Sequence, residues 1–185
     1  SEIIKQYDYK RQDVSFQEIN DLMGKTIDEI EDILFPDIPK EKRTEILAEA
    51  CKHENEYLAK YGARLFDNLE DTLENLSKKY RLFIVSNCQT GYIEAFLNYY
   101  NLDKYFEDYE HPKKPETVKS DNIKLIAKRN NLKNPVYVGD TQGDANATKE
   151  AGLEFIYASY GFGNVEEYKK RNGFKSFDCL YANKF

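Results

Sequence analysis

The sequence predicts an α/β fold in which a parallel sheet is flanked by helices and follows an all-helical segment. Two observations indicate this class. From residue 80 onward, short apolar runs typical of strands alternate with stretches of helical periodicity. Over the first seventy residues, helical patterns follow one another and no run resembles a strand. Because parallel strands need crossover connections, the alternation predicts right-handed strand–helix–strand units.

The composition is that of a globular protein with one domain, or one domain with an insertion. The 185 residues are 41% hydrophobic and 32% charged, with a net charge of −6 and a pI near 5.1. No basic face offsets this acidic balance, which argues against nucleic acid as the main partner. The apolar runs are too short to span a bilayer, so we expect no membrane association. No pattern specifies an oligomeric state.

Cysteine usage indicates the compartment. The three cysteines, Cys51, Cys88 and Cys179, are odd in number and share no metal-ligand spacing. Reduced thiols are the expected state of such cysteines, because disulfides belong to oxidising compartments. We therefore expect a cytoplasmic protein.

Helix-start signals recur in the N-terminal segment. Each is a Ser or Thr with a Glu three positions later, which is the pattern of a capping box. The two boxes are Ser15–Glu18 and Thr26–Glu29. A longer helix is expected over Lys40–Tyr61, ended by Gly62. His53, on this charged helix, is interpreted as a solvated histidine.

The remaining elements alternate in type. Strands are expected where β-branched and aromatic residues run together, with helices between them. In chain order they are helix Glu70–Lys79, strand Tyr80–Val85, helix Tyr92–Tyr100, a lysine-rich connector over Tyr105–Asp121, helix Asn122–Asn130, strand Val136–Val138, helix Ala145–Ala151, strand Glu154–Ala158, helix Val165–Arg171 and a short apolar segment over Phe177–Leu180. Ligands of open α/β sheets bind at the carboxyl ends of the strands. Polar residues that follow the strands are therefore the candidate site residues.

A hydroxyl and an amide follow the first predicted strand. Ser86 and Asn87 stand at its carboxyl end, just before a helix N-terminus. Backbone N–H groups and the helix dipole favour an anion at such a place. The alternative is that Ser86 or Thr90 only caps the helix.

Two carboxylates follow the second predicted strand. Val136–Val138 breaks at Gly139, and Asp140 and Asp144 come directly after it. Mg²⁺ is typically bound by few protein carboxylates together with water and substrate phosphate. The pair therefore predicts a Mg²⁺ site, and the alternative is that both residues only cap the next helix. A loop punctuated by glycines, Ser159–Gly163, is expected at the same edge of the sheet.

These signals occur in a fixed order along the chain: Ser86-Asn87, a lysine that heads a helix, and Gly139-Asp140 with Asp144 beyond. In this order the chain resembles the haloacid dehalogenase-like superfamily, and within it the phosphoglycolate-phosphatase-like hydrolases with a helical cap. The resemblance covers the whole chain. It implies that Ser86 and Asn87 hold the substrate phosphate and that Asp140 ligates Mg²⁺. It also implies that Asp144 supports the metal site through the metal's waters or through the lysine.

Two lysines are candidates for neutralising the phosphate and the nucleophile. Lys114 precedes a proline, as the lysine of many family members does. Lys119 lies four residues before Ile123 and immediately before the predicted helix, which matches the family's spacing better. We favour Lys119 as the catalytic lysine, although either ammonium could reach a phosphate oxygen.

The resemblance implies a helical cap domain over residues 1–66 and a haloacid dehalogenase-like α/β core over 67–185. The family's nucleophile is the first Asp of an Asp-x-Asp-Gly-Thr sequence at the end of the first, central strand, and the second Asp is the general acid/base. No such sequence occurs in this chain. Asp8 is no substitute, because nothing before it can form a strand. We therefore expect the natural polypeptide to begin before Ser1, and the chain as given to be inactive without that segment.

The expected function is a Mg²⁺-dependent phosphatase that acts on a small phosphorylated metabolite through an aspartyl-phosphate. The nucleophile for this reaction lies outside the given sequence. The alternatives are a non-catalytic protein that binds a phosphorylated ligand, and a phosphomutase or dehalogenase on the same scaffold.

Overall fold

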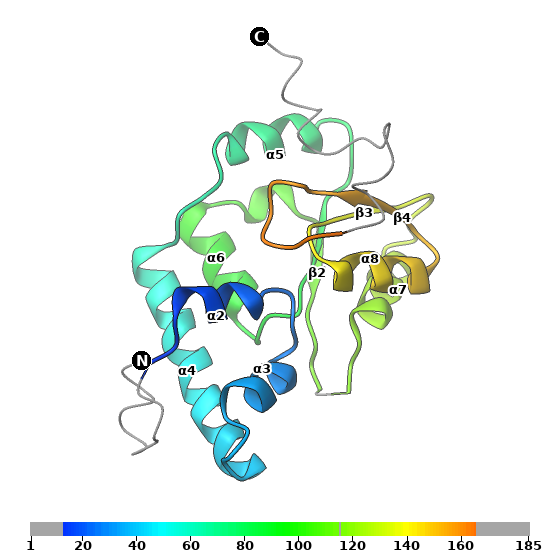
Figure 1. The fold of residues 1–185 in the computed structure, drawn as a ribbon. Helices are drawn as coiled ribbons and strands as arrows, with labels where there is room; N and C mark the ends of the chain where they lie inside the picture. Colours follow the sequence, from blue (N-terminus) through cyan, green and yellow to red (C-terminus); the bar gives the residue numbers. More distant parts are fainter. Residues whose placement is uncertain (1–12, 115, 166–185) are drawn as a thin grey trace. The chain divides into compact units, whose positions relative to one another are not determined.

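The structure of the protein is a computed structural model that describes residues 13–114 and 116–165. These residues form two compact units. Of the described residues, the first unit contains mainly 26–114, and the second contains 15–25 and 116–165. Each unit contains one pair of parallel strands with helices beside it (Figure 1). The predicted α/β class is thereby confirmed.

The first unit is mostly helical, and the α-helices described in it lie where the sequence predicts helices. Its helical elements are α3 (Ile27–Leu34), α4 (Lys40–Tyr61), α5 (Leu69–Ser77), α6 (Tyr92–Tyr100) and the 3₁₀ turn η1 (Asp103–Tyr105). The capping box of Thr26 at the start of α3 is present, and so is the box of Ser15 at the start of α2 (Phe16–Asp21) in the second unit. Helix α4 ends at Gly62, whose φ of 69° favours glycine. A Cβ there would also overlap the ring of Tyr99.

The apolar residues of the first unit form two clusters. One is made by Phe35, Ile46 and Leu47, which belong to α4 and to the turn before it. The other is made by Ile93, Leu97 and Leu102 of α6 and the residues after it. Helices α4 and α6 pack against each other along the unit (Figure 1).

The first unit contains one strand that the sequence did not predict. The unpredicted strand is β2 (Asp108–Glu110), which pairs in parallel with β1 (Phe83–Val85). The segment of β2 was expected to be part of a polar connector, and that expectation was wrong. Asp108 and Glu110 make it look like a loop, but pairing with β1 decides its conformation, as tertiary context does for strands. The backbone N–H of Ser86 continues the ladder by donating to the carbonyl of Glu110 at 3.1 Å.

The second unit is built from alternating strands and helices. They are α7 (Lys119–Arg129), β3 (Val136–Gly139), α8 (Gln142–Ala151) and β4 (Glu154–Tyr157). Strands β3 and β4 are parallel, with Gly139 opposite Tyr157 at the carboxyl end. Helix α8 contacts both β4 and α7 (Figure 1). Phe155, Tyr157 and Val165 form the buried core of this unit.

Some predicted features lie outside the described residues. They are the segment around Asp8, the apolar segment Phe177–Leu180 with Cys179, and the helix from Val165 beyond its first residue. Within the described part, neither Cys51 nor Cys88 forms a disulfide. No helix of that part is both long enough and apolar enough to cross a membrane. The division into a cap over 1–66 and a core over 67–185 stays a prediction.

Candidate functional site

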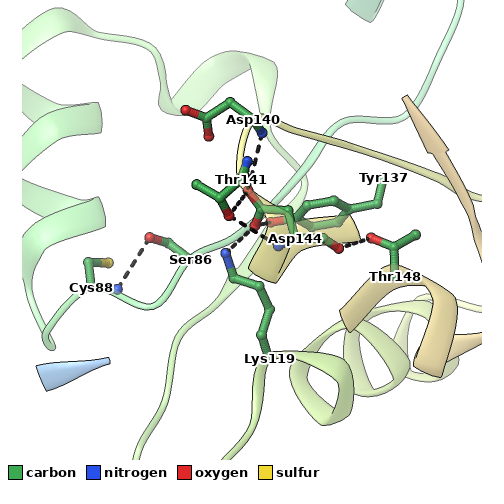
Figure 2. A network of polar contacts seen from close by, with 8 residues as sticks. All are labelled: Ser86, Cys88, Lys119, Tyr137, Asp140, Thr141, Asp144 and Thr148. Atoms are coloured by element: carbon green, nitrogen blue, oxygen red, sulfur yellow. Dashed lines mark hydrogen bonds and ion pairs between the residues drawn. The ribbon is translucent and has the colours of Figure 1, made fainter. Parts of the chain in front are cut away.

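An ammonium and a carboxylate meet between the first turns of α7 and α8 (Figure 2). Lys119 is the first residue of α7, and its Nζ lies 2.6 Å from Oδ1 of Asp144. The two side chains are only 11% and 6% exposed. Solvent screens such a pair weakly, and an interaction of this kind fixes both side chains. Asp144 therefore holds the lysine in one position.

The other oxygen of Asp144 organises the start of α8. Its Oδ2 accepts hydrogen bonds from the backbone N–H groups of Asp140 at 3.2 Å and Thr141 at 3.0 Å. Thr141 is the N-cap residue of α8, and its Oγ1 accepts from the N–H of Asp144 at 3.1 Å. The capping role considered for Asp144 is thus present together with the lysine contact. Asp140 precedes the cap residue and is not itself the cap.

Tyr137 is a third member of this cluster. Its hydroxyl lies 3.5 Å from Oδ1 of Asp144, and its ring centroid lies 5.8 Å from Nζ of Lys119. Tyr137 is not among the site residues that the sequence predicted. The available signal was that it lies on the same face of its strand as Gly139, because side chains alternate along a strand.

Burial and charge shift the pKa of each member of the cluster. Burial lowers the pKa of Lys119, but its electrostatic interactions and hydrogen bonds with Tyr137 and Asp144 outweigh this effect, so the pKa stands above its usual 10.5. Burial raises the pKa of Asp144, but Lys119 and the Thr141 hydrogen bonds outweigh this effect and hold it below 3.8. Burial raises the pKa of Tyr137 to about 12. At neutral pH the cluster is therefore an ammonium, a carboxylate and a neutral phenol.

The carboxylate of Asp140 is held by the loop that follows β4. The backbone N–H of Phe162 donates to its Oδ2 at 2.7 Å. A Cβ on Gly161 would overlap this carboxylate, and one on Gly163 would overlap the backbone carbonyl of Asp140. The glycines therefore allow the close approach. This contact confirms that the loop over Ser159–Gly163 lies at the same strand end as Asp140.

The two aspartates differ in whether a carboxylate oxygen is available to bind a metal ion. Among the described residues, Oδ1 of Asp140 accepts no hydrogen bond, so one carboxylate oxygen is available to a hard cation. Both oxygens of Asp144 already accept hydrogen bonds from protein donors. No cluster of three or more His, Cys, Asp or Glu that could hold a metal occurs in the described part. Asp140 thus fits a site that relies on water and substrate for its other ligands.

Ser86 and Asn87 follow β1 in the first unit, at the strand end where they were predicted. The Oγ of Ser86 accepts a hydrogen bond from the N–H of Cys88 at 3.3 Å, so its own proton is available to a ligand (Figure 2). The N-cap residue of α6 is Gly91, with a φ of 88° and no side-chain cap bond. Capping by Ser86 or Thr90, the alternative considered above, is therefore absent at α6.

The structure also separates the two candidate lysines by their surroundings. Lys119 is mostly buried against Asp144, whereas the side chain of Lys114 is exposed. The buried lysine has one geometry, and the exposed one has the freedom of a surface side chain. The catalytic assignment of Lys119 nevertheless rests on the family pattern, and it stays a prediction.

The fold and these side chains define an α/β protein with a fixed ammonium and an available carboxylate at the carboxyl end of a parallel strand. A sequence profile of haloacid dehalogenase-like hydrolases matches residues 1–158. The chain belongs to this family.

Similar proteins agree with the assignment. Phosphoglycolate phosphatase of Shigella boydii serotype 4 (strain Sb227) is 31% identical over 134 residues, which are 68% of this chain and 52% of that protein. The chain thus spans about half the length of the curated relatives it matches. A Bacteroides fragilis structure described as a haloacid dehalogenase-like hydrolase superposes with a TM-score of 0.75 at 22% identity, covering 91% of this chain and 81% of that one. An Entamoeba histolytica HAD hydrolase of family IA superposes with a TM-score of 0.69 at 21% identity, covering 95% and 81%. The two structures support the fold alone.

Proposed function

We propose that the protein is a Mg²⁺-dependent phosphatase that hydrolyses phosphate monoesters of small metabolites. The observation that carries the proposal is the buried pair of Lys119 and Asp144 beside the available oxygen of Asp140. A fixed ammonium next to a site for a hard cation suits the charge of a transferring phosphoryl group. The family and its phosphatase relatives support the same reaction class.

Each site residue has a proposed role. Ser86 and Asn87 bind oxygens of the substrate phosphate through a hydroxyl and an amide. Lys119 neutralises the phosphate, and Asp144 positions Lys119 through the bond at 2.6 Å. Because Asp144 also fixes the start of α8, the position of the lysine and the position of the loop around Asp140 are set together.

Asp140 is the proposed protein ligand of Mg²⁺. Asp144 supports the site through its contacts with Lys119 and with the backbone N–H of Asp140. When bound, Mg²⁺ supplies positive charge that stabilises the phosphoryl group. The chain's own contribution is to orient the Asp140 carboxylate, which the N–H of Phe162 holds by one oxygen.

The reaction also needs an attacking carboxylate, which forms an aspartyl-phosphate that water then hydrolyses. In the family this is the first Asp of Asp-x-Asp-Gly-Thr, and the 185 residues contain no such sequence. We propose that a segment outside them supplies it. The second candidate is a non-catalytic protein that binds a phosphorylated ligand, which the buried Lys119–Asp144 pair supports without an attacking group. Both candidates have a small phosphorylated molecule as partner and a cytoplasmic location.

Phosphate binding tests what both candidates share. Isothermal titration of the chain with inorganic phosphate or tungstate is expected to show binding that Ser86→Ala weakens roughly tenfold, because one hydrogen bond to a charged group is lost. Ser77→Ala, at the exposed end of α5, is the matched control and should bind like the parent. Unchanged affinity in Ser86→Ala would remove Ser86 from the phosphate site.

A further inference from the structure

The first unit contains a cavity of about 500 Å³ between α3, α4 and the loop after β1. The most buried charged group on its wall is Glu31, which is 2% exposed. Its Oε2 accepts a hydrogen bond from Oγ1 of Thr44 at 3.1 Å. A neutral hydroxyl is thus the hydrogen-bond partner of a carboxylate that is almost fully removed from bulk water.

No cation among the described residues forms an ion pair with Glu31. Lys52 lines the same cavity, but its ammonium lies 4.0 Å from Oε1 of Glu56, and these two side chains are 78% and 65% exposed. They form a solvated pair on one helix, which is typical of a helix surface. Lys40 is close enough to be influenced by the charge of Glu31, but its ammonium pairs with Asp28 at 3.2 Å. A buried carboxylate that has no ion pair is costly, so a bound cation would complete this site.

The cavity is joined to the proposed phosphate-binding residues through the loop after β1. Nε2 of Gln89 donates to Oδ1 of Asn55 at 3.0 Å, and Nδ2 of Asn55 donates to the carbonyl of Thr90 at 2.8 Å. These bonds fix the loop on α4. Gln89 lines the cavity and stands three residues after Ser86, so their backbones are at most about 11 Å apart. One small metabolite can span that distance.

We propose that this cavity receives the leaving group of the substrate and that Glu31 selects a leaving group with a protonated amine. The inference rests on the proposed function for the phosphate end of the ligand. Glu31 forms a charge-assisted hydrogen bond with the ammonium, while the amides of Asn55 and Gln89 set the polar wall of the cavity. A leaving group that ends in a carboxylate is repelled by Glu31.

The test compares two sugar phosphates that differ in one group. Isothermal titration of the chain with glucosamine 6-phosphate is expected to give a dissociation constant roughly tenfold below that for glucose 6-phosphate. In Glu31→Gln the two constants should become equal, since the amide keeps the acceptor for Thr44 but carries no charge. Thermal unfolding shows that the variant is folded.

Glu56→Gln is the matched control, because it removes the same charge from an exposed position on the cavity rim. It should keep the preference for the amine. Equal affinity for the two sugars in the parent chain, failure of both to bind, or a preference that persists in Glu31→Gln would overturn the inference. So would an equal loss in Glu56→Gln, which would indicate general attraction by the acidic surface.

If the proposed phosphate-binding function is wrong, the binding experiments give a different result. If Ser86→Ala leaves the binding of inorganic phosphate unchanged, the phosphate assignment is wrong. An amine preference that still depends on Glu31 would then support the cavity as an amine site by itself.

Discussion

Nζ of Lys119 and Oδ1 of Asp144 lie 2.6 Å apart, although 25 residues separate them in the sequence. The contact joins the first turn of α7 to the first turn of α8. Asp144 thus accepts a hydrogen bond from Lys119 with one oxygen and from the N-cap residue Thr141 with the other. A lysine that is fixed in this way can meet a phosphate without losing side-chain entropy at that moment.

Replacing this lysine should therefore do more harm than replacing the exposed one. Lys119→Met leaves the Asp144 carboxylate buried without its cation, which should lower the free energy of unfolding by about 3–5 kcal/mol. Lys114→Met, the matched control at an exposed position, should change it by less than about 0.5 kcal/mol. Urea unfolding measures both. In an enzyme supplied with its nucleophile, Lys119→Met should also lower kcat/KM roughly a hundredfold. The reverse ranking of the two variants would assign the role to Lys114.

Stability should depend on pH through the same cluster. The lowered pKa of Asp144 stabilises the fold above about pH 4, and this contribution is lost as the pH falls below 3.8. The raised pKa values of Lys119 and Tyr137 stabilise the fold below about pH 10. That contribution is lost as the pH rises from the ordinary tyrosine value of 10 toward 12.

The pH effect of each residue can be isolated by comparing unfolding curves of parent and variant. The stability difference between the parent and Asp144→Asn should shrink below pH 4, because the parent then loses its carboxylate charge. The difference between the parent and Tyr137→Phe should shrink above pH 10. Differences that stay constant with pH would show that these groups titrate normally.

The sequence predicted the helices of this chain better than its strands. α4 and α6 have the predicted ends, because Gly62 and the left-handed Asn101 stop them by local backbone geometry. Strand β2 was missed because Asp108 and Glu110 are ordinary loop residues, and only pairing with β1 makes them a strand.

The site shows the same division between local and tertiary information. Asp140, Asp144 and Lys119 were proposed from spacing, since strand ends and helix starts place them, and their roles stay predictions. Tyr137 and the N–H of Phe162 were not, because their roles come from contacts between segments. Likewise, the buried state of Glu31 cannot be inferred from a charged helix pattern.

Asp140→Asn should abolish Mg²⁺-dependent turnover in an enzyme supplied with its nucleophile, since the hard cation loses its charged ligand. Titration of Mg²⁺ in the presence of tungstate gives a second readout, and the variant should bind the metal at least about tenfold more weakly. Asp121→Asn, at an exposed position of α7, is the control and should behave like the parent. Normal Mg²⁺ dependence in Asp140→Asn would remove Asp140 from the metal site.

Gly161→Ala should displace the Asp140 carboxylate through the loop after β4. The added Cβ overlaps the Asp140 side chain, so the bond from the N–H of Phe162 should be lost and Mg²⁺ binding weakened. Gly143→Ala is the matched control. It lies on α8 with only an ordinary contact to Thr141, and it should raise stability by about 0.5–1 kcal/mol. Equal Mg²⁺ affinity in both variants would mean that the loop does not position Asp140.

The last prediction concerns the attacking group. Ser86, Lys119 and Asp140 have proposed roles in binding phosphate and metal, but a mechanism through a covalent intermediate also needs a carboxylate at the phosphorus atom. The 185 residues contain no Asp-x-Asp sequence, so this chain alone should not hydrolyse p-nitrophenyl phosphate, even with Mg²⁺. A version that carries a preceding strand ending in Asp-x-Asp-Gly-Thr should turn it over.

The control for that experiment is the same extended chain with the first Asp of the added motif changed to Asn, which should be inactive but should still bind tungstate. Its binding would show that the loss is chemical, because the phosphate-binding residues are still in place. Turnover by the unextended chain, with no other polypeptide present, would contradict the proposed need for an external nucleophile and would place the attacking group within these residues. Tungstate binding without turnover in the extended chain would instead favour the phosphate-binding alternative over the enzyme.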